Sequence, residues 1–453
     1  MKKADQSNAP GESFKRKIFS QGLPVFHLYA AGIDVGDTIY DVAISNGGTG
    51  HEVREYSTFT EDTTNLVDWL VSEGITTVAM ESTGVYWLNL YLMLEEAGIE
   101  PYLVNAKHAK NVAGRKKDDT DAIWLQKLHS CGLLQKSFQP EAEMRVLRSY
   151  VRQRKNLIRI SSDSVRRMQK AMELMNIKLH TVISDILGKT GLQMVNAIVN
   201  GERDPKELVK LKDPRIKASE EDLKKSLTGI WKKEYLFMLK QAYDEYLFYQ
   251  AQITACEEMI KEQLLNQAAK ILDGDLTDIQ LKKKPKKNQF SFGIQSLLKI
   301  IVGVDLCEVD GINEVSCLEL ISEIGTDMSK WNSGKHLSAW LNLAPNTKIT
   351  GGKIISSKMQ KKKNHAGQTL RMSASGLSKC KSPMGDYARK MKSRLGKTSA
   401  VPAIAHKLAR IVYTMIKEKR PYNHEIMSNN QEIWKEKRIK YLEKQLNQLK
   451  CAI

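Results

Sequence analysis

The sequence predicts an α/β domain built on a mixed β-sheet, followed by a long helical arm and a mostly α-helical C-terminal domain. Three observations predict this organisation. In residues 27–140 three strand patterns come first, and strands then alternate with helices, which is typical of a sheet with helices on its faces. Residues 141–275 repeat apolar side chains every seven positions. Residues 290–422 have helical patterns separated by short glycine-containing turns.

The strands and helices of the first domain can be placed one by one. Strands are expected at 27–34 and 39–45, joined by a tight turn at Gly36-Asp37, and a third strand at 52–59. A helix at 63–72 then leads to a mostly apolar strand at 75–81. An apolar helix at 85–97 and a last strand at 101–105 complete the sheet.

The second region predicts an antiparallel coiled-coil arm. Apolar side chains recur every seven residues in two stretches: Val151, Ile158, Val165 and Met172, and later Leu239, Tyr246, Ile253 and Ile260. Sustained heptads indicate helices packed along a common seam. Asn200-Gly201 and Asp213-Pro214 interrupt the span between the two stretches.

These patterns define six segments. They are a flexible N-terminal extension (1–26), the mixed-sheet domain (27–140), the arm (141–275), a lysine-rich linker (276–289), the C-terminal domain (290–422) and a terminal helix (423–453).

Composition favours a polyanionic partner. The 453 residues include 70 Lys+Arg against 52 Asp+Glu, a net charge of +18, and nucleic acid is the commonest partner of such a chain. The six cysteines are scattered singly, which argues against zinc sites and disulfides. No stretch approaches the ~18 apolar residues of a membrane span, so we expect no membrane partner and a cytoplasmic location.

Four carboxylates have the placement of a metal site. Asp34 and Glu81 each end an apolar strand, while Asp118 and Asp121 are three residues apart at the expected start of a helix. Hard oxygen ligands of this kind hold two Mg²⁺ or Mn²⁺ ions for phosphodiester chemistry. Taken singly, each residue is more often an ordinary turn or cap residue. The order of the whole set favours metal binding, with Asp37 and Asp119 as non-ligands.

At these residues the chain resembles the DEDD transposases of bridge-RNA insertion sequences, the IS110 family and especially its IS1111 group. The matching segments are AGIDVG (31–36), MESTGVYW (80–87), GRKKDDTDAIW (114–124), LAPNTKITGGK (343–353) and GKTSAVPAIAHKLA (396–409). The resemblance implies an RNase H-like (RuvC-like) domain over 27–140 and a transposase domain over 290–422.

The resemblance also implies an activity. Members of the family cut and rejoin DNA, with target and donor specified by a non-coding RNA, and strand exchange needs at least two active sites. We therefore expect target and donor DNA, bridge RNA and further copies of the chain, as a dimer or tetramer, as partners of a nucleoid-associated protein. The family combines the four metal-binding carboxylates with an attacking serine that precedes Gly-Gly.

Two positions depart from the family pattern. The residue before Gly351-Gly352 is Thr350 rather than serine; a threonine hydroxyl can attack a phosphate, although its methyl group crowds the approach. Ser356 and Ser357 are the nearby substitutes. The segment Asp310-Gly-Ile-Asn-Glu replaces the family's Pro-Gly-Ile-Gly in a helix-hairpin-helix-like turn. There Asn313 can still adopt the left-handed backbone conformation, which would allow the turn to be kept.

Two basic clusters are candidate nucleic-acid contacts. An arginine stripe runs along the arm, thickened by Arg154, Lys155, Arg167 and Lys170, and only Asp163 opposes it within residues 145–170. Its predicted contact residues are Arg145, Arg148, Arg152, Arg159 and Arg166. The second cluster follows Gly351-Gly352, with Lys353, Lys361 and Lys362 as predicted contacts.

Three other functions fit part of the sequence. An actin-like phosphotransferase also has Gly-Ile-Asp-x-Gly, but it needs a second glycine-rich nucleotide loop, and the middle of this chain has heptads instead. A RuvC-like structure-specific nuclease would use the same carboxylates with water as the nucleophile. A non-enzymatic nucleic-acid binder would not need the carboxylate set.

Overall fold

A computed structural model describes residues 24–46, 50–105, 120–274, 276, 281, 289–359, 364–423, 436, 439–443 and 445. The chain divides into two units, Met1–Gln139 and Pro140–Ile453. In the ranges described, none of the helices combines the length and apolar character needed to span a bilayer.

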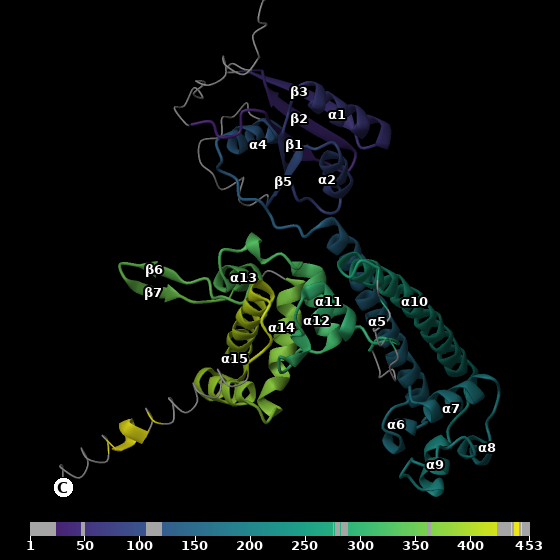
Figure 1. The fold of residues 1–453 in the computed structure, drawn as a ribbon. Coiled ribbons are helices and arrows are strands. Elements are labelled where there is room, and N and C mark those ends of the chain that lie inside the picture. The colour runs from purple at the N-terminus through teal and green to yellow at the C-terminus, as the bar shows by residue number, and fades with distance from the viewer. Residues whose placement is uncertain are drawn as a thin grey trace, which may run out of the picture. The chain divides into compact units, whose positions relative to one another are not determined.

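The first unit is a five-stranded mixed sheet between helices (Figure 1). Its elements are β1 (Ala30–Val35), β2 (Ile39–Ser45), β3 (His51–Ser57), α1 (Thr60–Ser72), β4 (Thr77–Glu81), α2 (Trp87–Glu96), β5 (Glu100–Val104) and α4 (Asp121–Ser130). The strand order is β3-β2-β1-β4-β5. β2 pairs antiparallel with both β1 and β3, and β4 pairs parallel with both β1 and β5. The mixed sheet predicted from the sequence is therefore confirmed.

Alternation along the strands assigns the two faces of this sheet. Ile33 on β1 and Met80 on β4 are fully buried among α1 and α2 side chains. Ala79 lies on the opposite face, in a cluster with Trp124, Leu125 and Leu128 of α4. The candidate functional side chains of this unit belong to the α4 face.

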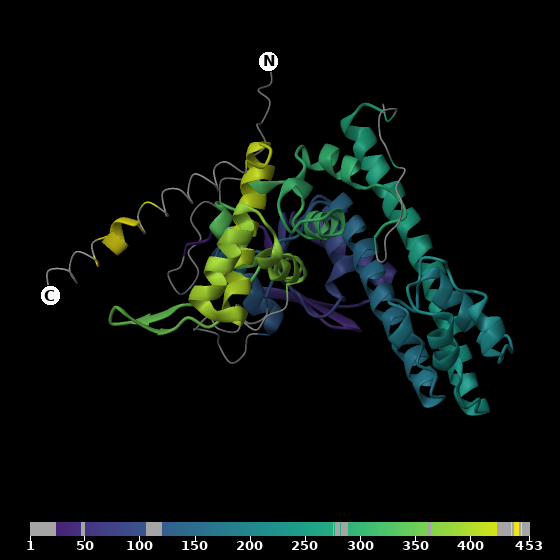
Figure 2. The ribbon, with the colours of Figure 1, turned by 90° about the horizontal axis from the view of Figure 1, so that it is seen from below.

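The second unit begins with two long helices packed along each other, α5 (Ala142–Leu174) and α10 (Lys233–Ile271), as both views of the ribbon show (Figures 1 and 2). All four predicted heptad positions of α10 are buried, from Leu239 to Ile260. On α5, Val151 and Met172 are buried, but Ile158 and Val165 are only half-buried, and Ser161 and Ser164 occupy the seam instead. Coiled-coil packing of this pair stays a prediction.

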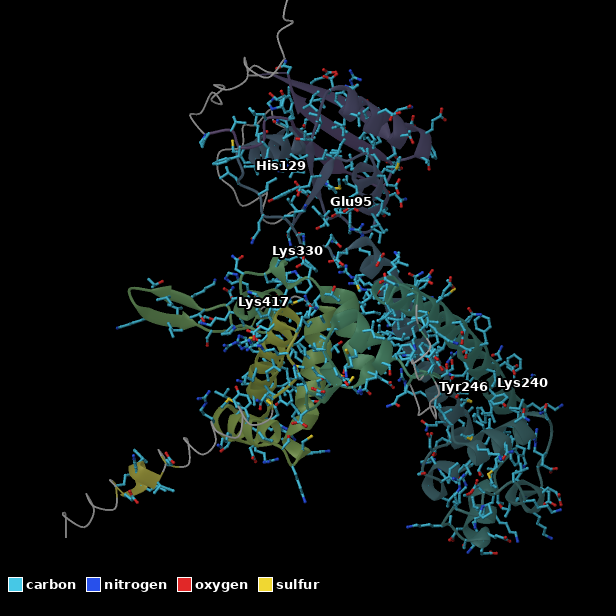
Figure 3. All side chains as sticks on the ribbon, viewed as in Figure 1. Glu95, His129, Lys240, Tyr246, Lys330 and Lys417 are labelled. Atoms are coloured by element: carbon cyan, nitrogen blue, oxygen red, sulfur yellow. The ribbon has the colours of Figure 1, made fainter. Side chains whose placement is uncertain are left out.

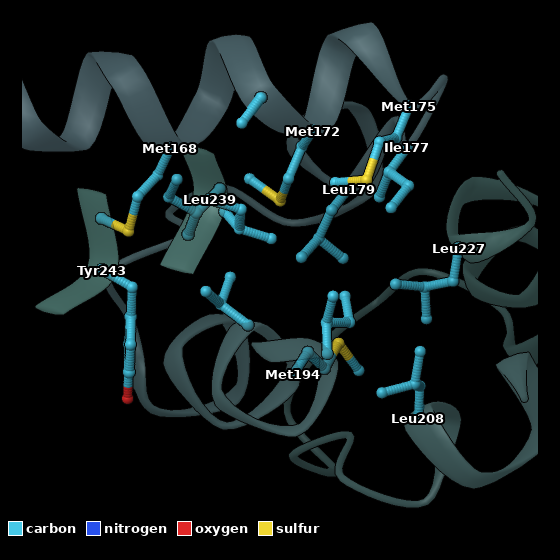
Figure 4. Close-up of a cluster of buried hydrophobic side chains, with 14 of the residues drawn as sticks. Met168, Met172, Met175, Ile177, Leu179, Met194, Leu208, Leu227, Leu239 and Tyr243 are labelled. Carbon is cyan, nitrogen blue, oxygen red and sulfur yellow. The ribbon is translucent and has the colours of Figure 1, made fainter. Parts of the chain in front are cut away.

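A small helical cap with its own core joins these helices. Its elements are α6 (Leu179–Val182), α7 (Lys189–Val199), α8 (Pro205–Val209) and α9 (Glu220–Leu227). Met172 and Met175 of the α5 end pack there against Leu179, Met194 and Leu227 (Figure 4). The heptad pattern did not predict this core, because the cap helices are too short to show a sustained period.

The rest of the second unit is mostly helical. Its elements are α11 (Gln295–Val302), η1 (Leu306–Glu308), α12 (Glu314–Ile324), η2 (Met328–Lys330), α13 (Gly334–Trp340), β6 (Lys348–Thr350), β7 (Lys353–Ser356), α14 (His365–Gly376), η3 (Leu377–Lys379) and α15 (Pro383–Glu418). The predicted helical character is confirmed, with one β-hairpin, β6–β7, added to it.

The turn before α12 differs from the expectation for Asn313. Gly311 has the positive φ of this turn, +87°. Asn313 has an extended backbone, with φ −106° and ψ 174°, and caps α12 by accepting a hydrogen bond from the Ser316 N–H at 2.9 Å. The left-handed conformation that asparagine permits is therefore not used at Asn313, which serves as the N-cap of the helix instead.

Candidate active site and nucleic-acid interface

Asp34 and Glu81 lie on neighbouring parallel strands and on the same face of the sheet. The register pairs Ile33 with Met80. Asp34 and Glu81 are the next residues along these two parallel strands, so they are neighbours across the sheet. Glu81 is 6% exposed and Asp34 is half-buried. Side chains two residues apart on a strand share a face. Asp34 therefore shares its face with Gly32, and Glu81 shares its face with Ala79, which is the face that α4 covers.

Asp121 reaches the same region from α4. It is the first residue of the helix, and Thr120 caps this end by accepting a hydrogen bond from the Ile123 N–H. Helical spacing puts Asp121 on the side of α4 that carries Leu125 and Leu128, which pack on the sheet beside Ala79. A carboxylate is also favourable at a helix N-terminus, where the helix dipole is positive.

The close packing of α4 on β1 depends on a missing side chain. A Cβ at Gly32 would lie 2.3 Å from the Ala122 carbonyl oxygen and 2.3 Å from the Gln126 nitrogen. With only hydrogen there, the helix backbone can approach the strand directly. Gly32 thus sets the distance at which α4 presents Asp121 to the sheet.

Buried hydrogen bonds fix the position of α4 along the sheet. Gln126 donates to the Ala30 carbonyl at 3.3 Å and to Ser130 Oγ at 2.9 Å, and its Oε1 lies 2.9 Å from His51 Nε2. His129, marked in Figure 3, has its Nε2 at 2.9 Å from Thr77 Oγ1. Burial, followed by the charge of His27, lowers the pKa of His129 to about 4, so the imidazole is neutral near pH 7.

A carboxylate that we did not predict joins this face. Asp41 on β2 is the cross-strand partner of Asp34, and paired residues of a sheet point to the same side. With the predicted turn at Gly36-Asp37, the cross-strand partner of Asp34 would have been Ile39. The actual turn closes with a hydrogen bond from the Gly36 N–H to the Ile39 carbonyl. It lies one residue further along the chain than predicted, and this shifts the register to Asp41.

The fourth predicted carboxylate, Asp118, lies outside the described residues, as do Asp119, Lys361 and Lys362. Among the side chains that the structure does describe, no three from His, Cys, Asp and Glu lie close enough together to hold a metal ion. Asp34, Glu81 and Asp121 share a face of the sheet, but these three described carboxylates do not form such a group by themselves.

Thr350 lies at the tip of the β6–β7 hairpin. Gly351 and Gly352 form the two-residue turn with φ of +53° and +74°, the backbone that type I′ hairpin turns require. Thr350 pairs with Lys353, and Ile349 pairs with Ile354 on the other face. The register then shifts by one residue, and Lys348 pairs with Ser356. The Thr350 hydroxyl thus shares an exposed face with two lysines, of which Lys348 had not been predicted.

The arginine stripe of α5 is opposed by carboxylates from α12. Arg152 donates two hydrogen bonds to Glu323, and Lys155 lies 2.8 Å from Glu319. Arg148 donates to the carbonyls of Ser322 and Glu323 at 3.1 and 2.9 Å. Within residues 145–170 only Asp163 opposes this face, and from this we inferred a one-sided charge. That inference is wrong, because these further partners come from residues about 170 positions away in the chain.

Other stripe residues also have protein partners. Arg145 donates to the Pro140 carbonyl, Arg159 to Asn156, and Arg166 forms an ion pair with Asp163. Arg154 is buried, with its guanidinium 2.7 Å from Glu257 and 3.9 Å from the Phe290 ring. Nucleic-acid binding by the stripe stays a prediction. Unopposed positive charge no longer supports it, because these side chains have partners within the protein.

Comparison with known families bears on both units. Residues 31–177 match the family model of IS110 DEDD transposases, whose description is "Transposase". Residues 305–389 match the model described as "Transposase IS116/IS110/IS902 family". Together the two matches cover just over half of the chain. No curated protein sequence matches it. The chain belongs to the IS110 family of DEDD transposases and is a DNA-processing enzyme of the transposase type.

Proposed function

We propose that this transposase is an RNA-guided DNA recombinase of an insertion sequence, which cuts and rejoins DNA through a covalent link to Thr350. The observation that carries the proposal is the β6–β7 hairpin, where the Thr350 hydroxyl is exposed on one face between Lys348 and its cross-strand partner Lys353. Two cations beside a hydroxyl favour a phosphate over a neutral substrate.

The first unit is proposed to be an RNase H-like catalytic domain. The support is its topology, in which an antiparallel β1–β2–β3 meander is followed by the parallel strands β4 and β5. Asp34 and Glu81 at the ends of adjacent central strands are the second support. The α5 and α10 pair is proposed to form the coiled-coil arm, and the support is that the two long helices pack along each other.

The carboxylate set suits Mg²⁺ or Mn²⁺. All its donors are carboxylate oxygens, which hard divalent cations prefer. Asp34 directly opposite Asp41 places like charges side by side, an arrangement that a cation would relieve. Asp34, Glu81, Asp121 and Asp118 are the proposed ligands. Bound there, the metal would stabilise negative charge that develops on the attacking and leaving oxygens.

The proposed reaction is a transesterification. The Thr350 oxygen forms a bond to phosphorus as one phosphodiester P–O bond breaks, and the hydroxyl proton passes to the departing strand end. Attack by the hydroxyl of a second strand end then reverses these changes, rejoins the DNA and regenerates Thr350. The bond energy is conserved, so no further reactant is needed. Lys348 and Lys353 would hold the phosphate in line with Thr350.

RNA guidance and assembly are further parts of the proposal. Their support is the family resemblance, together with a net charge of +18 that can accommodate two nucleic acids. Exchange of strands between two DNA molecules needs at least two Thr350 hydroxyls, so the active form would contain two or four copies of the chain.

A denaturing gel tests the covalent step, with labelled element-end DNA, protein, guide RNA and Mg²⁺. Wild type should form a protein–DNA adduct, Thr350→Ser should keep or increase it, and Thr350→Ala should abolish it. Ser356→Ala and Ser357→Ala are matched controls that should retain it. An adduct with Thr350→Ala but not with a serine variant would move the nucleophile to that serine. Cut DNA without any adduct would instead favour the RuvC-like nuclease that uses water.

A further inference from the structure

A connected basic surface is formed by η3 and the first half of α15. Its cations are Lys379, Lys381, Arg389, Lys390, Lys392, Arg394 and Lys397. Asp386 is the single carboxylate among residues 377–397, and it forms an ion pair with Arg389. All the cations are exposed except Lys392, which is half-buried.

Hydrogen bonds unite the two segments into one surface. Arg389 Nη1 donates to the carbonyls of Ser378 at 3.0 Å and Cys380 at 2.8 Å. Lys392 Nζ donates to Ser378 Oγ at 2.5 Å. These contacts hold α15 against η3, so Lys379 and Lys381 lie beside the cations of the helix.

The backbone adds positive potential at the same place. Gly396 interrupts α15 with φ 78° and ψ 166°, and the chain re-enters the helix at the exposed residues that follow. The first N–H groups of a helix have no intrahelical acceptor and carry its positive dipole end. The second half of α15 therefore begins next to Arg394 and Lys397.

This surface differs from the arginine stripe of α5 in its charge balance. Carboxylates of α12 form ion pairs with the stripe. Within residues 377–397, all of which the structure describes, the single ion pair joins Arg389 to Asp386. Exposed like charges repel one another, and a polyanion is the partner that relieves the repulsion. A merely solvated helix face would more often carry mixed signs.

We propose that this η3–α15 surface binds the phosphate backbone of duplex DNA. The proposal deepens the proposed function, because a recombinase must hold the duplex beside the bond that it cuts. Duplex DNA is favoured over RNA because DNA is the substrate of the family to which the chain belongs. Contacts to phosphates position the DNA without reading its sequence.

The test compares two variants of the full-length chain with the same change in charge. One carries Lys379→Gln, Lys381→Gln, Lys390→Gln and Lys397→Gln, which spares Arg389 and Lys392 because they hold the surface together. The control carries Lys206→Gln, Lys217→Gln, Lys232→Gln and Lys233→Gln, four exposed lysines of the helical cap and the start of α10. Both are made in an Asp34→Asn background, and circular dichroism checks that both remain folded.

Affinity for a fluorescent duplex of mixed sequence is measured across a salt series. The slope of log K against log salt should become shallower by up to about 3.6 in the surface variant, at about 0.9 for each of four phosphates that are no longer neutralised, and stay unchanged in the control. An equal reduction in both variants would overturn the proposal, as would unchanged duplex binding with weakened binding of an RNA hairpin. Binding needs neither Thr350 nor strand cleavage, so failure of the covalent mechanism would leave this result unaffected.

Discussion

Arg152 donates two hydrogen bonds to Glu323, from Nε to Oε1 at 2.7 Å and from Nη2 to Oε2 at 2.9 Å. Glu323 is buried, and Arg148 donates to its backbone carbonyl, so one acidic residue near the end of α12 joins two arginines of α5. The arm is thereby attached to the transposase domain through charged groups. The stripe that the sequence offered as a nucleic-acid contact is in part this internal interface.

The first prediction concerns this pair. Glu323→Gln should weaken the packing of α12 on α5 by roughly 2 kcal/mol, because hydrogen bonds to charged groups are the stronger ones. Hydrogen exchange of the α12 amides should speed up accordingly. Arg152→Gln should have a smaller effect alone and little further effect when combined with Glu323→Gln. Fully additive effects would mean that the two side chains do not act as a pair.

The second prediction concerns Gly32. Gly32→Ala should destabilise the first unit by about 1–3 kcal/mol, the usual cost of adding atoms to a filled core, because its Cβ would meet the α4 backbone at 2.3 Å. Strand cleavage should fall as well, since α4 would shift and move Asp121. Gly376→Ala is the matched control, because no heavy atom lies within 4 Å of its added Cβ. Cleavage and thermal unfolding are measured together; wild-type values for Gly32→Ala would contradict the close packing.

The third prediction is a pH dependence that arises from His129. Its folded pKa of about 4 lies below the ordinary value of 6.5, so the unfolded chain binds a proton more readily than the folded one. The contribution of His129 to the free energy of unfolding is therefore complete above pH 6.5, declines as the pH falls and is lost near pH 4. This contribution amounts to about 3 kcal/mol, at 1.36 kcal/mol for each pKa unit.

NMR titration of the histidine ring protons measures this pKa directly. His129→Gln, which keeps a polar atom near Thr77, should flatten the acid sensitivity of the first unit between pH 6.5 and 4. A His129 ring that titrates near 6.5 would rule out the buried neutral imidazole.

The fourth prediction concerns the carboxylates. Asp34→Asn, Glu81→Gln and Asp121→Asn should each abolish strand cleavage while leaving circular dichroism unchanged. In metal-free buffer Asp34→Asn should slightly raise the melting temperature, because it removes the like charge opposite Asp41. Added Mg²⁺ should raise the melting temperature of wild type, as any ligand of the folded state does, but not of this variant. Equal stabilisation of both would place the metal elsewhere.

Local patterns determined much of this fold. Five strands and their helices follow from apolar alternation, and the ends of β2, Ile39 and Ser45, agree with the sequence prediction to the residue. Asp34 and Glu81 could be picked out because each follows an apolar run, although β1 continues past Asp34 to Val35. Such features depend on neighbours within a few positions, which is the range over which side-chain periodicity carries information.

Charge pairing and strand register lay beyond that range, and only the tertiary structure decided them. Asp41 faces Asp34 because the turn lies one residue further along the chain than predicted, and Lys348 joins Thr350 because the hairpin pairing sets its face. Glu323 reaches Arg152 across 171 positions of sequence. A count of nearby charges cannot anticipate such a partner, since the attraction between two ions depends on their separation in space and not along the chain.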